Sequence, residues 1–489
     1  MKIKFSKETY PLYIITLLGL ALLTYTSVRA GMLSFTHDES NTFLRHFPES
    51  FMQIVSYHQP KANNHIINTL LIKYTLKIFP DTDFFIRLPN LIAHGIYILF
   101  SILILKRFRN SILIIGGFVL INFNPYLLDF FSLARGYGLA LGFMLISIHL
   151  LLKNIESKQK KYIYWSYLFA SLAVLSHFVY LHFYVTVIAI FNLVHFNEFV
   201  AKNLTIKQKF NRFLKTNIPT TIISTLLIFI LFEPIRKLSK FNELYGHGNN
   251  SFFRDTIISF VNGSNYGKNY SQQFVETASI ILLVLIIIIF ITGIFDLKNK
   301  NYQFKKSLLS ISFALLLLPA LSSILQHHIL GDEYLSYRLT LLFVPILGLS
   351  IVSFFDFFIN SKYKIPASIL LMLISGSMFF HTINAANFKY FSEWKYDANT
   401  KNMILELEKV VPEKTKNQTV KLGINWLFEP TINFYRQTRN LDWLEKVTRE
   451  GIDDNYDYLY VLKDQLPDIE NAAIIKEYEI SQSVLLKKE

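Results

Sequence analysis

The sequence contains no cysteine and little charge. Because none of its 489 residues is Cys, disulfides and thiolate chemistry are excluded. Charged residues make up only 17% of the chain, whereas 52% of it is hydrophobic and 16% is aromatic. Several apolar runs approach the ~20 residues that an α-helix needs to cross a bilayer. The composition therefore predicts an integral membrane protein and is compatible with a bacterial envelope.

Acidic residues are scarce, with 35 Asp and Glu against 49 Lys and Arg, a formal net charge of +14. In a soluble protein this excess of cations would suggest a nucleic-acid partner. Here the Lys and Arg residues are concentrated in alternate connections between the apolar segments, as in membrane proteins, so no nucleic-acid partner is expected. The segments assigned to the cytoplasm hold 21 Lys and Arg and are 1–10, 106–110, 153–161, 197–215, 298–306 and 360–364. The opposite connections are about twice as long in total, hold 12, and are 31–88, 128–136, 234–272 and 326–338. This bias predicts a cytoplasmic N-terminus in the cytoplasmic (inner) membrane.

Eleven apolar segments are predicted to span the membrane as α-helices. They are 10–30, 84–105, 111–128, 136–152, 162–178, 181–196, 216–233, 274–295, 307–325, 337–358 and 365–383. The first lacks a small-x-small cleavage site, so we predict a retained span rather than a signal peptide. An odd number of spans puts the termini on opposite sides. We therefore predict a multi-pass domain over 1–383 and an extracytoplasmic domain over 384–489.

The tail beyond the last span is charged and mixed in composition. Residues 394–411 and 428–437 have helical apolar spacing, whereas 419–425 and 456–462 alternate as strands do. The order helix, strand, helix, strand predicts a small α/β domain. It carries no recognised catalytic motif.

Two long connections lie on the predicted outer side. Residues 31–83 include 65–79, whose apolar positions recur at helical spacing and predict a helix lying in the membrane interface. Residues 234–272 are rich in Gly, Asn and Ser and predict a mobile loop of the kind that often closes over a site.

The stretch FTHDESNTF (35–43) places two carboxylates, Asp38 and Glu39, just after the first span. Solvated residues beside a membrane are the simplest explanation of such a pair. Other polar groups predicted on the same side are Asn63, Asn64, His65, Arg135, Tyr137, His327, His328, Asp332, Glu333 and Arg338. Each alone has an ordinary explanation, since Asn caps helices and an interfacial Arg extends its charge into water. Together they gather carboxylates, amides, histidines and two arginines beside spans that can admit a lipid.

Five short motifs follow one another along the chain: the acidic pair, the NNH run, FFIRLPNLI (84–92), an Arg-Gly-Tyr turn and a late Tyr-Arg span. In this order they resemble the polytopic GT-C glycosyltransferases, with bacterial members akin to protein mannosyltransferases, lipid A aminoarabinose transferases and lipopolysaccharide-core sugar transferases. The resemblance covers about residues 1–385. Many members have Pro-Pro-Leu at the helix start that here reads His-Ile-Ile, which leaves the subfamily open.

The resemblance implies an inverting enzyme that moves a sugar from a polyprenyl-phosphate carrier to a lipid, glycan or protein acceptor on the outer side of the membrane. Asp38 would be the general base and Glu39 would orient the acceptor or a metal. Arg135 and Arg338 would clamp the lipid phosphate. The other implied substrate-binding positions are Asn64, His65 and Tyr137. No cofactor is implied with certainty; a divalent ion requires His37, Asp38, Glu39 and His327 to converge, and no recognised metal-ligand spacing supports it.

Two alternatives stay open. A transporter or non-catalytic envelope protein is one, although transporters commonly show internal repeats and ionisable groups near mid-membrane, whereas here the charges sit at span ends. A polyprenyl-linked oligosaccharide ligase or polymerase is the other, although those proteins usually carry their functional arginines in a large late outer loop. The early acidic pair favours the transferase.

Overall fold

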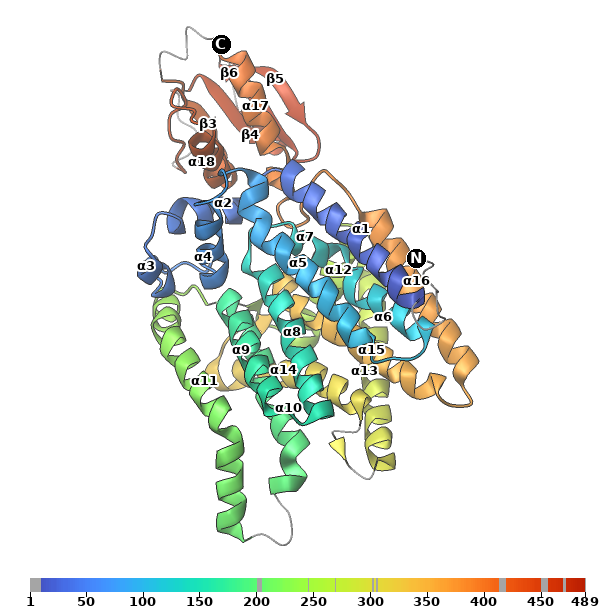
Figure 1. The fold of residues 1–489 in the computed structure, drawn as a ribbon. Coiled ribbons are helices and arrows are strands. Elements are labelled where there is room, and N and C mark those ends of the chain that lie inside the picture. Colours follow the sequence, from blue (N-terminus) through green and yellow to red (C-terminus); the bar gives the residue numbers. More distant parts are fainter. Residues whose placement is uncertain are drawn as a thin grey trace, which may run out of the picture. The chain divides into compact units, whose positions relative to one another are not determined.

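The computed structural model describes residues 10–199, 205–244, 246–268, 270–300, 303–304, 307–412, 419–449, 456–468 and 472–488. The chain divides into two compact units, which are described separately below (Figure 1). Unit 1 comprises Met1–Thr24, Asn90–Phe131 and Gly136–Ala386. Unit 2 comprises Tyr25–Pro89, Ser132–Arg135 and Asn387–Glu489. Because α1 (Tyr10–Met32) and α5 (Asp83–Leu105) each contribute to both units, the chain passes between them several times.

Unit 1 is almost entirely helical. Its long helices are α6 (Ser111–Asn122), α8 (Gly136–Ser157), α9 (Lys160–Ser176), α10 (Leu181–Phe199), α11 (Ile206–Lys240), α13 (Gln272–Asn299), α14 (Leu308–Leu330), α15 (Phe343–Ile359) and α16 (Lys364–Ala385). Its short elements are α7 (Pro125–Phe131), η1 (Phe178–Tyr180), β1 (His247–Gly248), η2 (Phe252–Ile258), α12 (Ser259–Asn265), β2 (Tyr334–Leu335) and η4 (Tyr337–Leu342). Among the described residues, nine helices are long and apolar enough to cross a membrane. The protein is therefore a multi-pass membrane protein, as predicted.

The predicted span 111–128 is broken in the structure. Helices α6 and α7 are bent by 64° at a short break, and only as a pair do they reach the length of a span. The break falls directly before Pro125, which has no N–H to donate and disfavours a helical conformation in the residue before it. Helix α9, with 17 residues, is also shorter than the helices that pass this test.

The predicted loop 234–272 is largely helical, which corrects the sequence-based expectation. Helix α11 continues to Lys240, and η2 and α12 follow. The Ser251 hydroxyl accepts a hydrogen bond from the Arg254 amide (3.2 Å), and Asp255 accepts one from the Ser251 amide (2.8 Å). Ser251 thus caps η2, because Ser stabilises helix starts as readily as turns.

Unit 2 combines residues after the first span with the C-terminal tail. Its first part holds α2 (His37–His46), α3 (Phe51–Val55) and α4 (Ile66–Thr75), the last within the predicted amphipathic segment. The tail holds η5 (Lys395–Asn399), α17 (Thr400–Val410), β3 (Leu422–Ile424), η7 (Trp426–Phe428), α18 (Glu429–Thr438), β4 (Tyr458–Leu462), η8 (Lys463–Asp468), β5 (Ala472–Tyr478) and β6 (Ser483–Lys488). The predicted helices and strands of the tail are confirmed; β5 and β6 were not predicted.

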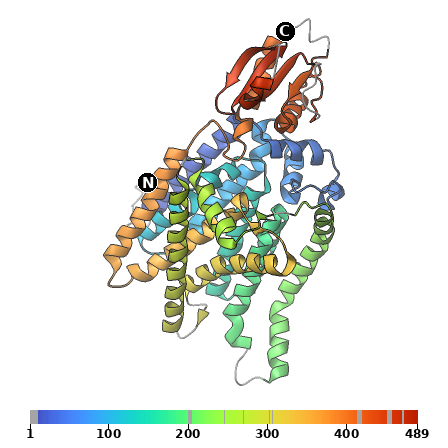
Figure 2. The same ribbon diagram turned by 180° about the vertical axis from the view of Figure 1, so that it is seen from behind.

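The strands form one sheet in the order β3-β4-β6-β5, visible from both sides in Figures 1 and 2. The β3–β4 pair is parallel and the other two pairs are antiparallel. The core of the tail also takes in Phe35 and Phe43, whose rings lie 4.0 and 5.2 Å from the ring of Phe434 in α18. Residues around α2 therefore share a hydrophobic core with the tail. A separate domain over 384–489 stays a prediction.

Candidate active site

The acidic pair lies in the first turn of α2, which begins with a capping box. The Thr36 hydroxyl accepts a hydrogen bond from the Glu39 amide (3.4 Å), and Glu39 Oε2 accepts one from the Thr36 amide (3.0 Å). The pattern Thr-x-x-Glu is visible in the sequence and could have predicted this start. Asp38 thereby occupies the second helical position, where the helix dipole favours a negative charge.

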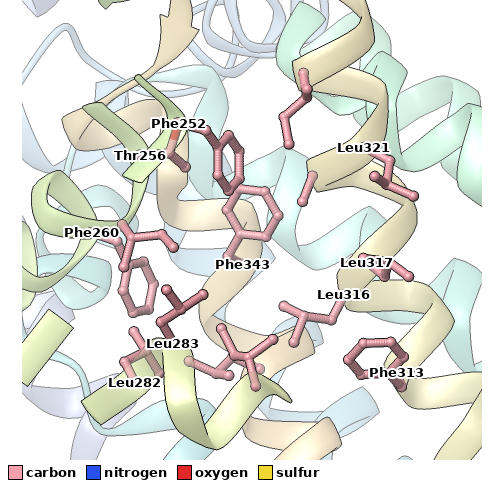
Figure 3. A pocket seen from close by; sticks show the side chains of 15 residues that line it. Phe252, Thr256, Phe260, Leu282, Leu283, Phe313, Leu316, Leu317, Leu321 and Phe343 are labelled. Carbon is pink, nitrogen blue, oxygen red and sulfur yellow. The ribbon is translucent and has the colours of Figure 1, made fainter. Parts of the chain in front are cut away.

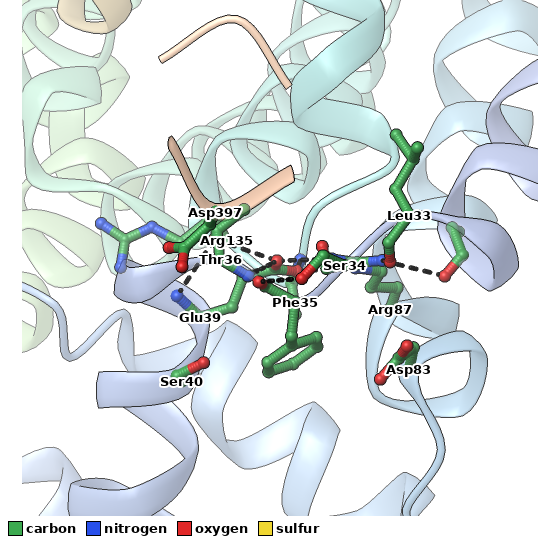
Figure 4. A network of polar contacts seen from close by, with 12 residues as sticks. Leu33, Ser34, Phe35, Thr36, Glu39, Ser40, Asp83, Arg87, Arg135 and Asp397 are labelled. Carbon is green, nitrogen blue, oxygen red and sulfur yellow. Dashed lines mark hydrogen bonds and ion pairs between the residues drawn. The ribbon is translucent and has the colours of Figure 1, made fainter. Parts of the chain in front are cut away.

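Glu39 is fully buried and its carboxylate accepts from five donors (Figure 4). Arg87 donates from Nε to Oε1 (2.8 Å) and from Nη2 to Oε2 (2.6 Å). The Ala134 amide donates to Oε1 at 2.6 Å, and Thr36 donates to Oε2 from both its amide and its hydroxyl at 3.0 Å. Because both oxygens are occupied inside the protein, this carboxylate holds its neighbours in place.

Arg87, near the start of α5, uses all five of its N–H groups. Besides the two bonds to Glu39, it donates to the carbonyls of Ala30 (3.0 Å), Leu33 (2.9 Å) and Ser34 (2.9 Å). The Ala30 carbonyl lies in the last turn of α1, where carbonyls have no partner in the helix, and Leu33 and Ser34 follow the helix end, so Arg87 satisfies backbone groups that the helix does not. The Arg87–Glu39 pair therefore fixes the chain between α1 and α2. This arginine belongs to the FFIRLPNLI motif, but its role was not predicted.

The same network fixes the short segment 132–135. The Ala134 amide is held by Glu39, and the Ala134 carbonyl accepts a hydrogen bond from Asn68 Nδ2 (2.9 Å). Asn68 is fully buried in α4. Because both backbone groups of Ala134 are engaged, the next residue, Arg135, is held in one position.

Arg135 lies against Asp38, and a shared role of the two residues in one site stays a prediction. Its Nη2 is 3.3 Å from Asp38 Oδ2, and its Nη1 is 3.2 Å from Asn63 Oδ1 and 3.4 Å from the Thr42 hydroxyl. These distances are at the long end for hydrogen bonds, so the guanidinium is oriented without being tightly held. The Asp38 side chain keeps 15% of its surface exposed, whereas that of Glu39 keeps none.

The charge of Asp38 influences two carboxyl groups of the tail, which were not predicted. Asp397 accepts a hydrogen bond from the His37 amide at Oδ2 (2.7 Å) and one from the Thr400 hydroxyl at Oδ1 (3.1 Å). Burial raises the pKa of Asp397 to about 8, against the effect of these hydrogen bonds, and the Asp38 charge adds to the rise. Burial, followed by the Asp38 charge, likewise raises the pKa of Glu393 to about 8. Both are single acidic residues without a motif, so no sequence signal marks them.

This burial predicts a pH-dependent stability. Asp397 binds its proton more tightly in the folded chain, where its pKa is about 8, than in the unfolded chain, where its pKa has the ordinary value of 3.8. Unfolding at a pH between these two pKa values therefore releases a proton. Its contribution to the free energy of unfolding should therefore fall as the pH rises from about 4 to about 8 and stay level above. Asp397→Asn removes this contribution, so its melting temperature relative to wild type should rise over that window. A difference that does not change with pH would contradict the assignment.

His37 links α2 to the tail on its other side. Its Nδ1 lies 2.8 Å from the Leu427 carbonyl, and its Nε2 lies 3.4 Å from Nη2 of Arg449. A carbonyl only accepts and a guanidinium only donates, so the ring is neutral with its proton on Nδ1. Burial, the largest influence, lowers the pKa of His37, which agrees with a neutral ring.

The three residues of the NNH run make different contacts. Asn63 contacts Arg135, whereas Asn64 is fully buried, donates from Nδ2 to the Ile54 carbonyl (2.9 Å) and accepts from the Thr69 hydroxyl (3.1 Å). His65 is the N-cap residue of α4 and is buried, but its side chain makes no capping hydrogen bond. The contacts of Asn64 thus tie its own segment together. Substrate binding by Asn64 and His65 stays a prediction.

The remaining predicted residues belong to unit 1. Tyr137 lies in the first turn of α8, is 3% exposed and packs its ring 4.1 Å from that of His177. Arg338 lies in η4 and is partly buried. His327 has its Nδ1 2.6 Å from the Asp332 carbonyl and its ring 3.9 Å from that of Tyr334. Within the described ranges no three His, Asp or Glu side chains gather as metal ligands, and a divalent ion stays a prediction.

Unit 1 also contains an apolar pocket of about 200 Å³ (Figure 3). Side chains from η2, α12, α13, α14 and α15 line it, including Phe252, Phe260, Leu282, Leu317 and Phe343. The one polar side chain of the lining belongs to Thr256, whose hydroxyl donates to the Leu335 carbonyl (2.8 Å). The pocket is therefore suited to a hydrocarbon chain.

Many apolar helices together with a small C-terminal sheet define a polytopic membrane protein. No protein-family model and no curated protein matches the sequence. Two solved structures are similar over 98% of this chain and 98% of their own. They are ArnT from Cupriavidus metallidurans in the apo state, with a TM-score of 0.53 and 11% identity, and the same protein bound to undecaprenyl phosphate, with 0.50 and 10%. ArnT is an aminoarabinose transferase, and the chain has the GT-C fold, which confirms the predicted fold class.

Proposed function

We propose that this protein is an inverting glycosyltransferase that moves a sugar from a polyprenyl-phosphate donor to a lipid, glycan or protein acceptor. The observation that carries the proposal is the position of Asp38. It is a partly exposed carboxylate in the first turn of a helix, beside Arg135, in a chain with the GT-C fold. The protein that shares this fold has also been solved with undecaprenyl phosphate bound, which supports a lipid-linked donor.

The proposed reaction is a single displacement. Asp38 accepts the proton of the acceptor hydroxyl while the hydroxyl oxygen forms a bond to the anomeric carbon of the donor sugar. The bond from that carbon to the phosphate oxygen breaks on the opposite face, and the polyprenyl phosphate leaves with the electron pair. One attack from the far face inverts the configuration at the anomeric carbon.

The leaving phosphate gains negative charge, which cations stabilise. We assign this role to Arg135 and Arg338. The contacts of Arg135 within unit 2 are long, from 3.2 to 3.4 Å, so a phosphate can compete for its N–H groups. In unit 1, Arg338 precedes Phe343 of the apolar pocket by five residues, about 10 Å at the rise of a 3₁₀-helix. A phosphate at Arg338 can therefore have the start of its polyprenyl chain in that pocket.

Glu39 takes a positioning role in this proposal. With its oxygens occupied by Arg87, Thr36 and Ala134, it holds α2 and Arg135 at a fixed separation. The acceptor then meets Asp38, whose side chain reaches the surface.

The proposal places Asp38 on the outer side of the cytoplasmic membrane, with the N-terminus inside. A reporter enzyme that works only outside the cytoplasm, fused after residue 385 at the end of α16, should be active. The same reporter fused after Ser361, between α15 and α16, should be inactive. An inactive reporter after residue 385 together with an active reporter after Ser361 would contradict the proposed topology.

A further inference from the structure

Unit 2 contains a polar groove of about 710 Å³ between α2 and α18, for which the mechanism above has no use. Its lining has four side-chain amides, three cations, two carboxylates and a single apolar side chain, Leu44. The lining residues are Asn41, Leu44, Arg45, Glu429, Asn433, Arg436, Gln437, Asn440, Asp442 and Lys446. A groove with this lining suits a ligand covered with hydroxyl groups, because amides both donate and accept hydrogen bonds.

The groove is net positive. Glu429 is neutralised, since its Oε2 is 3.1 Å from Nε of Arg449 and its Oε1 accepts from Asn433 Nδ2 (2.9 Å). The lining then has one uncompensated carboxylate, Asp442, and three cations, Arg45, Arg436 and Lys446. The remaining charge favours an anionic ligand.

Two of these cations are held in a fixed orientation. Arg45 donates from Nε to Asn41 Oδ1 (3.3 Å), and Arg436 donates from Nε to the Leu444 carbonyl (2.6 Å). In the part of the chain that the structure describes, no acceptor lies against the terminal nitrogens of either guanidinium. Each arginine is thus oriented through Nε and presents its outer N–H groups, the arrangement that binds phosphate or carboxylate oxygens.

The groove is connected to Asp38. Asn41 and Arg45 follow Asp38 by three and seven residues in α2, so the three lie on one side of the helix, spread over about 10 Å. Arg449 contacts both the groove and His37: its Nε lies 3.1 Å from Glu429 Oε2, and its Nη2 lies 3.4 Å from His37 Nε2. Its guanidinium also lies over the ring of Trp426, which is 53% exposed. A ligand in the groove can therefore extend toward the proposed base.

We propose that this groove binds the acceptor, and that the acceptor is an anionic saccharide bearing phosphate or carboxylate groups. The inference rests on the proposed function, because it places the acceptor hydroxyl at Asp38. An acidic peptide is the less suitable ligand, since peptide recognition usually needs apolar pockets for side-chain anchors and Leu44 is the only apolar residue of the lining.

Binding to the purified full-length protein in detergent tests the inference. The probes are tetragalacturonate, the uncharged tetrasaccharide of galactose, and tetraglutamate. We expect tetragalacturonate to bind with an affinity that falls with salt, and the double variant Arg45→Gln/Lys446→Gln to weaken it by about tenfold or more. The control is Arg439→Gln, since Arg439 pairs with Glu408 (2.6 Å) and lies outside the groove lining, and it should bind like wild type.

The outcomes separate this inference from the proposed function. No binding of tetragalacturonate, equal binding of the uncharged sugar or of tetraglutamate, or an unchanged double variant would each overturn the anionic-saccharide site. Asp38→Asn should keep the binding of tetragalacturonate while losing transfer. If Asp38→Asn transfers normally while the double variant still loses binding, the groove stands and the proposed base does not.

Discussion

Asp38→Asn is expected to reduce the rate of sugar transfer by about 10²–10⁴-fold, the usual contribution of a positioned general base. The amide has nearly the shape of the carboxylate but cannot take the acceptor proton. Because Asp38 is partly exposed and the network around Glu39 does not depend on it, the variant should melt within a few degrees of wild type. Purified protein with a polyprenyl-phosphate sugar gives the rate, and cells carrying the variant should accumulate the donor lipid.

The control for this experiment is Asp81→Asn, an exposed acidic residue of the same unit that should transfer normally. If Asp38→Asn retains full activity at equal expression, Asp38 is a solvated residue beside the membrane and the proposed mechanism falls. If neither the purified protein nor cells consume any polyprenyl-linked sugar, the transporter or ligase alternatives return.

Arg87→Met should be the most destabilising single change in unit 2. It leaves Glu39 buried without its cation and removes the donors that satisfy the carbonyls of Ala30, Leu33 and Ser34. Breaking a buried ion pair by removing one partner costs about 3–5 kcal/mol in the free energy of unfolding. We therefore expect a large fall in melting temperature and in the yield of folded protein, followed through tryptophan fluorescence.

The matched control is Arg439→Met, which removes one partner of an exposed arginine–glutamate pair with a 2.6 Å contact. An exposed pair of this kind contributes about 0–1 kcal/mol, so this variant should melt near wild type. Equal melting of the Arg87 and Arg439 variants would mean that the buried pair does not hold the chain between α1 and α2. Loss of transfer in Arg87→Met with an unchanged melting temperature would instead place Arg87 in the chemistry.

A chain of contacts connects the end of the membrane helix α1 to Asp38, the proposed base. The end of α1 is held by Arg87, Arg87 holds Glu39, and Glu39 holds Ala134. Arg135 follows Ala134 in the chain and contacts Asp38. Each of the side-chain contacts joins segments that are far apart in sequence, so a change at one contact should displace the others.

The local features of this protein were determined by its sequence. Apolar runs of membrane length predict the spans, alternating residues predict β3 and β4, and Pro125 explains the break between α6 and α7. Hydropathy and periodicity reveal such features because they depend on neighbouring residues alone. Short motifs and a family resemblance singled out Asp38 and Arg135, which the structure places in contact.

Which side chains contact one another was decided only by the tertiary structure. Glu39 and Arg87 are 48 residues apart, Arg135 and Asp38 are 97 apart, and Asp397 reaches the His37 amide across 360 residues. No local pattern records such a pairing, since a buried carboxylate and an exposed one look alike in sequence. Whether an acidic residue supports the fold or faces a substrate depends on which donors surround it, and for Asp38 and Glu39 the folded chain gives two adjacent carboxylates opposite environments.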